Sequence, residues 1–95
     1  MHNLILDGEE MTSKEGAHQH LAVIMDFPQY YGENLDALWD LLTVISEPTQ
    51  ITLINGEKLI QALGDYGEAI ISIFEEAAAF NHKLSFFREN CPSSP

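Results

Sequence analysis

Cysteine and basic residues are both scarce in this chain, and each shortage excludes a class of protein. There is one cysteine, Cys91, so no disulfide can form within the chain. A secreted domain held by disulfides is therefore excluded, and we expect a reducing, cytoplasmic location. Four Lys or Arg residues stand against fifteen Asp or Glu residues, a formal net charge of −11. Such a chain repels nucleic acid and anionic membranes and attracts basic proteins.

Long apolar runs are also missing. The run at 51–54 is interrupted by Thr52, and no charged and then apolar leader opens the chain, so we expect no membrane segment. The 95 residues suffice for one compact domain, which we place at 1–90. The end of the chain at 91–95 is rich in Pro and Ser and is expected to be a disordered tail.

The spacing of apolar residues predicts three strands and four helices. Short apolar runs predict strands at 3–6, 50–54 and 84–87. Helical spacing predicts a first helix that begins at a capping box of Thr12 and Glu15 and ends before Pro28, and a second helix capped by Asn34. Two more helices are expected, a short one at 59–63 and a longer one over 69–77 that stops near Asn81. This order calls for right-handed crossovers between parallel strands, a three-stranded α/β fold of the order β-α-α-β-α-α-β.

The second predicted helix carries an acidic face. No Lys or Arg occurs between Lys14 and Lys58. At about 100° per residue, Asp36, Asp40 and Thr43 fall opposite the apolar positions of this helix. Asp36 lies in the first turn, where the helix dipole favours a carboxylate, so a structural and a functional role are equally open to it. Asp40 lies beyond that turn and has no capping task, which favours a functional role.

Aromatic residues surround this acidic face. At least one of Tyr30 and Tyr31 is expected to close the core, and tyrosine at the surface is a preferred anchor of protein interfaces. Trp39 falls at the edge of the apolar side of the helix. Gly32 is expected to permit a turn conformation that other residues resist.

Residues 30–40, with the sequence YYGENLDALWD, resemble the signature of the barstar family of ribonuclease inhibitors. The resemblance extends to the order of elements and implies an inhibitor that plugs the active site of a basic ribonuclease of the barnase type by acidic phosphate mimicry. It implies no catalytic residue, no cofactor and no metal. The partner-binding residues that it implies are Tyr30, Gly32, Asn34, Asp36, Trp39, Asp40, Thr43 and, on the fourth helix, Glu76. We add Tyr31 to these, because tyrosine is a preferred anchor of protein interfaces. The chain departs from barstar at Val44 and Ile45, where barstar has Gly and Trp.

Three other interpretations of these residues are possible. A hydrolase that uses Asp36 and Asp40 as an acid and a base is disfavoured, because both would sit on one convex helix surface. His18 and His20 are two residues apart and do not face each other on a helix, so we expect no metal site there and all four histidines at the surface. A barstar-like module that binds a different basic toxin or partner stays open, because a fold does not fix a function. The free protein is expected to be monomeric.

Overall fold

The structure, a computed structural model, describes residues 2–89, so the expected tail at 91–95 with Cys91 lies outside the described residues. The predicted α/β fold with the order β-α-α-β-α-α-β is confirmed, with one short 3-10 helix in addition. The elements are β1 (His2–Asp7), η1 (Gly8–Glu10), α1 (Lys14–Met25), α2 (Leu35–Thr43), β2 (Thr49–Ile54), α3 (Gly56–Leu63), α4 (Asp65–Phe80) and β3 (Leu84–Arg88).

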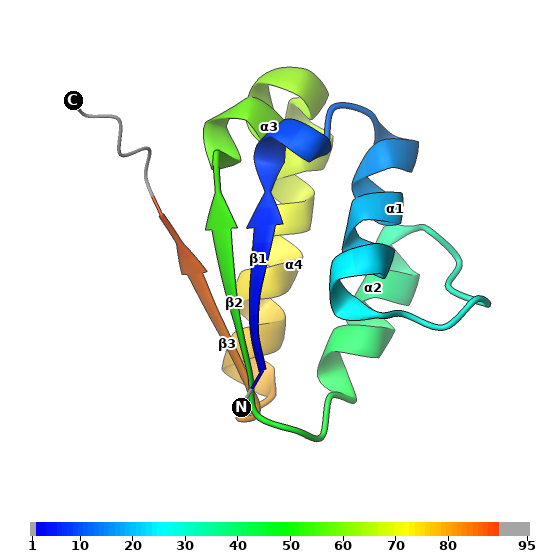
Figure 1. Cartoon of the computed structure of the whole chain (residues 1–95), viewed down its shortest axis with the longest axis vertical. Coiled ribbons are helices and arrows are strands. Elements are labelled where there is room, and N and C mark those ends of the chain that lie inside the picture. Colours follow the sequence, from blue (N-terminus) through cyan, green and yellow to red (C-terminus); the bar gives the residue numbers. More distant parts are fainter. Residues whose placement is uncertain (1, 90–95) are drawn as a thin grey trace.

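The three strands form one parallel sheet in the order β1-β2-β3, and Figure 1 shows their arrows pointing the same way. Both crossovers move in the same direction across the sheet, so right-handed connections place the helices on one face. In β2 the burial alternates, with Ile51 and Leu53 buried and Thr52 only half-buried between them. This alternation shows that one face of the sheet carries the core while the other is more open. Among residues 2–89, no helix combines the length and the apolar character needed to cross a membrane.

Side chains cap the first two long helices. The predicted capping box at Thr12 is wrong, because the N-cap of α1 is Ser13, whose hydroxyl accepts a hydrogen bond from Gly16 N at 2.9 Å. When Ser13 is the N-cap, the third residue of the helix is Gly16. Glycine has no side-chain carboxylate that could accept the second hydrogen bond of a capping box, from the N-cap amide. Asn34 caps α2 as predicted, its Oδ1 accepting from Ala37 N at 2.8 Å.

His18 on α1 lies in the core, so the prediction that all four histidines are at the surface is wrong. Its side chain is 1% exposed, and its Nδ1 and Nε2 lie 2.6 Å and 2.7 Å from the hydroxyls of Tyr31 and Tyr66. A neutral imidazole has one donor and one acceptor, so both ring nitrogens are satisfied and burial costs little. His18, Tyr31 and Tyr66, here called the histidine bridge, join α1, the loop before α2, and α4.

Asn81 joins the end of α2 to the end of α4. Its Nδ2 donates to the carbonyls of Leu42 and Ile45, both at 3.0 Å, and its Oδ1 accepts from Lys83 N at 3.0 Å. Carbonyls at the end of a helix have no partner within the helix, so this amide satisfies groups that would otherwise need water. Asn81 thereby fixes the position of α2 against α4.

The histidine bridge predicts a stability that falls in acid. Burial lowers the pKa of His18 below the 6.5 of an exposed histidine, and the nearby charge of Glu33 opposes this only in part. The unfolded chain therefore takes up a proton at a higher pH than the folded protein does. This contribution is complete above about pH 6.5 and is lost as the pH falls from there through the pKa of the folded state, by at most about 1.4 kcal/mol per pH unit.

Urea unfolding from about pH 7.5 down to pH 5 measures this loss. The variant His18→Phe should be less stable at neutral pH by roughly 1 to 3 kcal/mol, because two tyrosine hydroxyls lose their partner. The free energy of unfolding of this variant should also depend less on pH than that of the wild type over this range. An equal pH dependence of the free energy of unfolding in the two proteins would contradict the assignment of the loss in acid to His18.

Replacement of Asn81 by Ala should cost roughly 1 to 3 kcal/mol in the free energy of unfolding, because two carbonyls at the end of α2 lose their donor. The matched control is Asn3→Ala on the exposed part of β1, which should change stability by less than about 0.5 kcal/mol. Both values come from urea denaturation at neutral pH. An equal, small loss in both variants would show that Asn81 does not hold the two helices together.

Candidate partner-binding surface

The acidic face of α2 consists of Asp36, Asp40 and Thr43. Leu38 and Leu42 are buried, whereas Asp36 and Asp40 are exposed, as the helical spacing predicts. Across residues 2–89 the ion pair that forms is the one between His2 and Glu47, so neither aspartate is paired with a cation. The Thr43 hydroxyl donates back to the carbonyls of Trp39 at 3.0 Å and Asp40 at 3.2 Å, which leaves its oxygen free to accept.

The two tyrosines before α2 have different environments. Tyr31 is buried, its ring centroid 4.8 Å from that of Phe27 and its hydroxyl bonded to His18, so it closes the core as expected for one member of the pair. Burial raises the pKa of Tyr31 well above its ordinary value, so it stays a neutral phenol. Tyr30 is 83% exposed. Of the two, Tyr30 is available for contact at the surface, and Tyr31 supports the loop from beneath.

The turn into α2 is built differently from the prediction. The residue with left-handed backbone is Glu33, with φ 56°, and Gly32 is not among the residues with positive φ. Gly32 matters through its lack of a side chain instead, because a Cβ there would lie 3.1 Å from Asn34 Nδ2. That same amide donates to the Gly32 carbonyl at 3.3 Å. Asn34 therefore holds both the helix and the loop before it.

Trp39 and α4 border the acidic face on one side. The Trp39 ring is half-buried against the core, with its centroid 5.9 Å from that of Phe80 at the end of α4. Phe80 is 67% exposed and was not identified from the sequence. Phe80 follows Ala77 by three residues, the spacing of neighbours on one side of a helix, and this spacing was the available sign that the fourth helix extends to Phe80. Glu76 is exposed one turn before Phe80 and so lies on the same side of α4.

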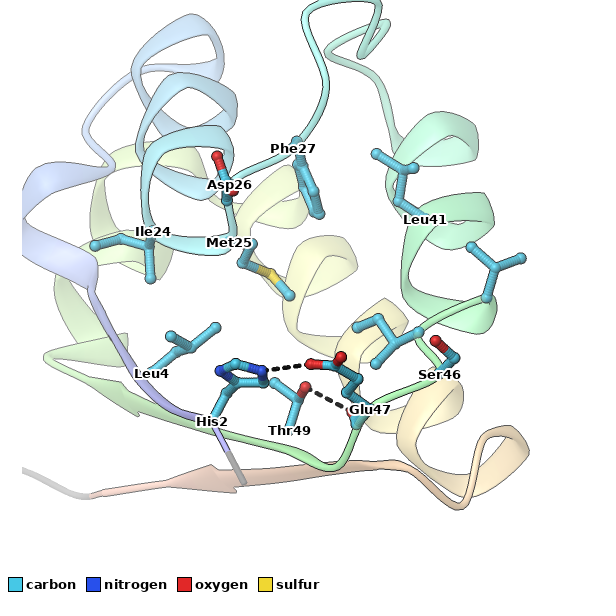
Figure 2. Close-up of a pocket in the computed structure, with 12 residues that line it drawn as sticks. His2, Leu4, Ile24, Met25, Asp26, Phe27, Leu41, Ser46, Glu47 and Thr49 are labelled. Atoms are coloured by element: carbon cyan, nitrogen blue, oxygen red, sulfur yellow. Dashed lines mark hydrogen bonds and ion pairs between the residues drawn. The ribbon is translucent and has the colours of Figure 1, made fainter.

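A cavity of about 570 Å³ opens on the other side of α2, and no sequence pattern indicates it directly. Figure 2 shows Met25, Phe27 and Leu41 around it, with the bond between His2 and Glu47 at its base. The side chains that line it are those of His2, Leu4, Ile24, Met25, Asp26, Phe27, Leu41, Val44, Ile45, Ser46, Glu47 and Thr49. Asp36 and Asp40 are not among them.

This arrangement suits binding of cations better than acid and base catalysis. The two aspartates lie on an exposed helix surface outside the cavity, so they cannot flank a substrate held there. Within residues 2–89, no group of three His, Cys, Asp or Glu side chains could hold a metal ion. Exposed carboxylates without a cation can accept charge-assisted hydrogen bonds from Arg, Lys or His of another protein.

Comparisons with known proteins agree with this geometry. The model of the Barstar family, described as Barstar (barnase inhibitor), matches residues 1–88. The chain is also 40% identical over 78 residues to a Bacillus subtilis (strain 168) protein named "Putative ribonuclease inhibitor YrdF". That alignment covers 81% of this chain and 86% of the relative. The resemblance seen in the sequence is confirmed, as is the prediction that the chain is not an enzyme, because the chain belongs to the Barstar family.

Proposed function

We propose that this protein is a cytoplasmic inhibitor of a basic ribonuclease of the barnase type. The observation that carries the proposal is the exposed pair Asp36 and Asp40 on α2, which has no cation partner among residues 2–89, in a chain of the Barstar family. The name of the Bacillus subtilis relative supports the same class of target. A basic nuclease needs cations to bind RNA phosphates, and an acidic helix face of this kind can occupy those cations.

In the proposed mechanism Asp40 takes the place of a substrate phosphate. Its carboxylate accepts charge-assisted hydrogen bonds from Arg and His groups of the nuclease, and Asp36 pairs with a second cation. Tyr30, exposed in the loop before α2, covers a catalytic histidine of the nuclease. The border of the contact is formed by Gly32, Asn34, Trp39, Thr43 and Glu76. Tyr31 contributes by holding the loop in place.

Charge also sets the rate of association. All four Lys and Arg residues lie outside 15–57, so the loop before α2 and α2 itself present negative charge alone. Opposite charges steer two proteins together and raise the association rate, and dissolved salt screens this effect. Inhibition by this protein should therefore develop faster at low than at moderate ionic strength.

A second candidate function is immunity against a different basic toxin or binding of another basic partner. The observation that favours it is Val44, which is 70% exposed directly after α2, at the position where barstar has Gly. Such a change at the border of the contact would alter which partner fits. This candidate predicts tight binding that needs Asp40 but no inhibition of RNA cleavage.

The first experiment measures inhibition of barnase and other small basic bacterial ribonucleases by the wild type and by Asp40→Ala. We expect stoichiometric inhibition by the wild type and an inhibition constant roughly thirtyfold or more weaker for the variant, a magnitude already known for close charge pairs of barnase and barstar themselves. The matched control is Glu10→Ala on η1, an exposed residue far from α2 in the chain. Its inhibition constant should stay within about threefold of that of the wild type.

Two results would contradict the proposal. Equal inhibition by wild type and Asp40→Ala would remove Asp40 from the contact. Failure of the wild type to inhibit any ribonuclease of the panel would leave the second candidate function, and binding of a different basic protein that depends on Asp40 would then support it.

A further inference from the structure

The cavity beside α2 results from the way in which the helices are paired. α2 packs against α4, while α1 packs against β1, so the ends of α1 and α2 diverge instead of closing on each other. Figure 2 shows these two helix ends on opposite sides of the cavity. Several apolar side chains that line it, among them Leu41, Met25 and Phe27, are only partly buried. The walls therefore offer apolar surface to a guest.

The mouth of the cavity is negative. The C-cap residues of α1 and α2, Asp26 and Val44, both line it, and the C-terminal end of each helix carries about half a unit of negative charge. Neither α1 nor α2, both fully described, has a basic residue in its last turn to offset this. The charges of Asp26 and Glu47 add to it, and the described residues that line the cavity include no Lys or Arg. His2 also lines the cavity and offsets the charge of Glu47 only when its imidazole is protonated.

Glu47 is the carboxylate best placed to receive a cation. Its Oε1 lies 2.7 Å from His2 Nε2, and this hydrogen bond lowers the pKa of Glu47, so the group is ionised at neutral pH. The side chain is well exposed, and in Figure 2 its carboxylate turns toward the interior of the cavity. The second oxygen has no partner among the hydrogen bonds of the described residues and can accept one from a guest.

We propose that this cavity is a second anchor site, which takes an arginine side chain of the same basic protein that the acidic face binds. This inference rests on the proposed function and extends it. Arginine combines an apolar stem, which fits against Leu41 and Met25, with a guanidinium group that pairs with a carboxylate and stacks on an aromatic ring such as that of Phe27. The negative mouth and the apolar walls thus match the two halves of one side chain.

One partner can reach both sites. Val44 follows Asp40 by four residues, so it lies about 40° further around the helix axis, toward Leu41. Val44 lines the cavity and is exposed, which makes the acidic face and the cavity one continuous surface. A nuclease seated on Asp40 therefore needs only a basic side chain at the edge of its active site to enter the cavity.

The test uses the double variant Asp26→Asn/Glu47→Gln, which removes two charges and keeps the size of both side chains. Asn tolerates the left-handed backbone of residue 26, with φ 56°, and Gln can still bond to His2. The matched control, Glu9→Gln/Glu10→Gln on η1, changes the net charge equally at the other end of β1. Inhibition of the ribonuclease that the wild type inhibits best is measured in about 0.15 M salt, where steering by distant charges is largely screened.

We expect the inhibition constant of the cavity variant to be weaker than that of the wild type by about tenfold or more, and that of the control to stay within about threefold of the wild type. Equal inhibition constants for the two double variants, with a wild type that does inhibit, would overturn the cavity proposal and leave the proposed function intact.

A second measurement does not depend on a ribonuclease. N-acetyl-arginine amide is titrated into the wild type while the methyl signals of Leu4, Leu41 and Val44 are followed by NMR. We expect a saturable shift with a dissociation constant on the order of millimolar, as suits so small a ligand, and a clearly weaker response in Asp26→Asn/Glu47→Gln. N-acetyl-norleucine amide, which lacks the cation, should give no saturable shift. The absence of a shift with the arginine compound, or equal shifts with both compounds, would overturn the proposal even if the ribonuclease assay failed.

Discussion

Two hydrogen bonds to one buried imidazole hold the loop before α2 against the rest of the molecule. His18 on α1 bonds to Tyr31 in that loop and to Tyr66 on α4, so α1, the loop that follows it and the distant α4 meet at one side chain. The loop has no strand or helix of its own between Met25 and Leu35. Its shape therefore depends on Tyr31 below and on the Asn34 cap at its end. In this loop Tyr31 is buried and Tyr30 beside it is exposed.

The position of α2 depends on contacts at both of its ends. Asn34 fixes the first turn, and Asn81 holds the carbonyls of Leu42 and Ile45 after the last turn. Between these ends Leu38 and Leu42 are buried in the core, which leaves Asp36 and Asp40 no orientation except outward. The acidic face is thus placed by apolar burial on the opposite side of the helix, and its carboxylates need no partner within the chain to be held in place.

Features that depend on neighbours in the sequence could be predicted, and features that depend on distant partners could not. The leucine spacing of α2, the Asn34 cap and the order of strands and helices follow from local patterns, and the structure has them. The burial of His18 depends on Tyr66, 48 residues away, and no local pattern indicates such a pair. The cavity likewise results from how α1 and α2 diverge in space. The N-cap of α1 was missed by one residue, since Thr12 and Ser13 have similar side chains and either could cap the helix. The left-handed residue before α2 was also missed by one residue, because it is Glu33 and not the glycine beside it.

The unpaired aspartates of α2 have a consequence for the free protein itself. Two like charges one turn apart repel each other by a few tenths of a kcal/mol, and the nearest Lys and Arg residues along the chain lie well outside α2. This repulsion opposes the favourable interaction of Asp36 with the N-terminal end of the helix dipole. A cationic partner would remove this repulsion on binding, so the relief of like charge on α2 adds to the attraction between the two proteins.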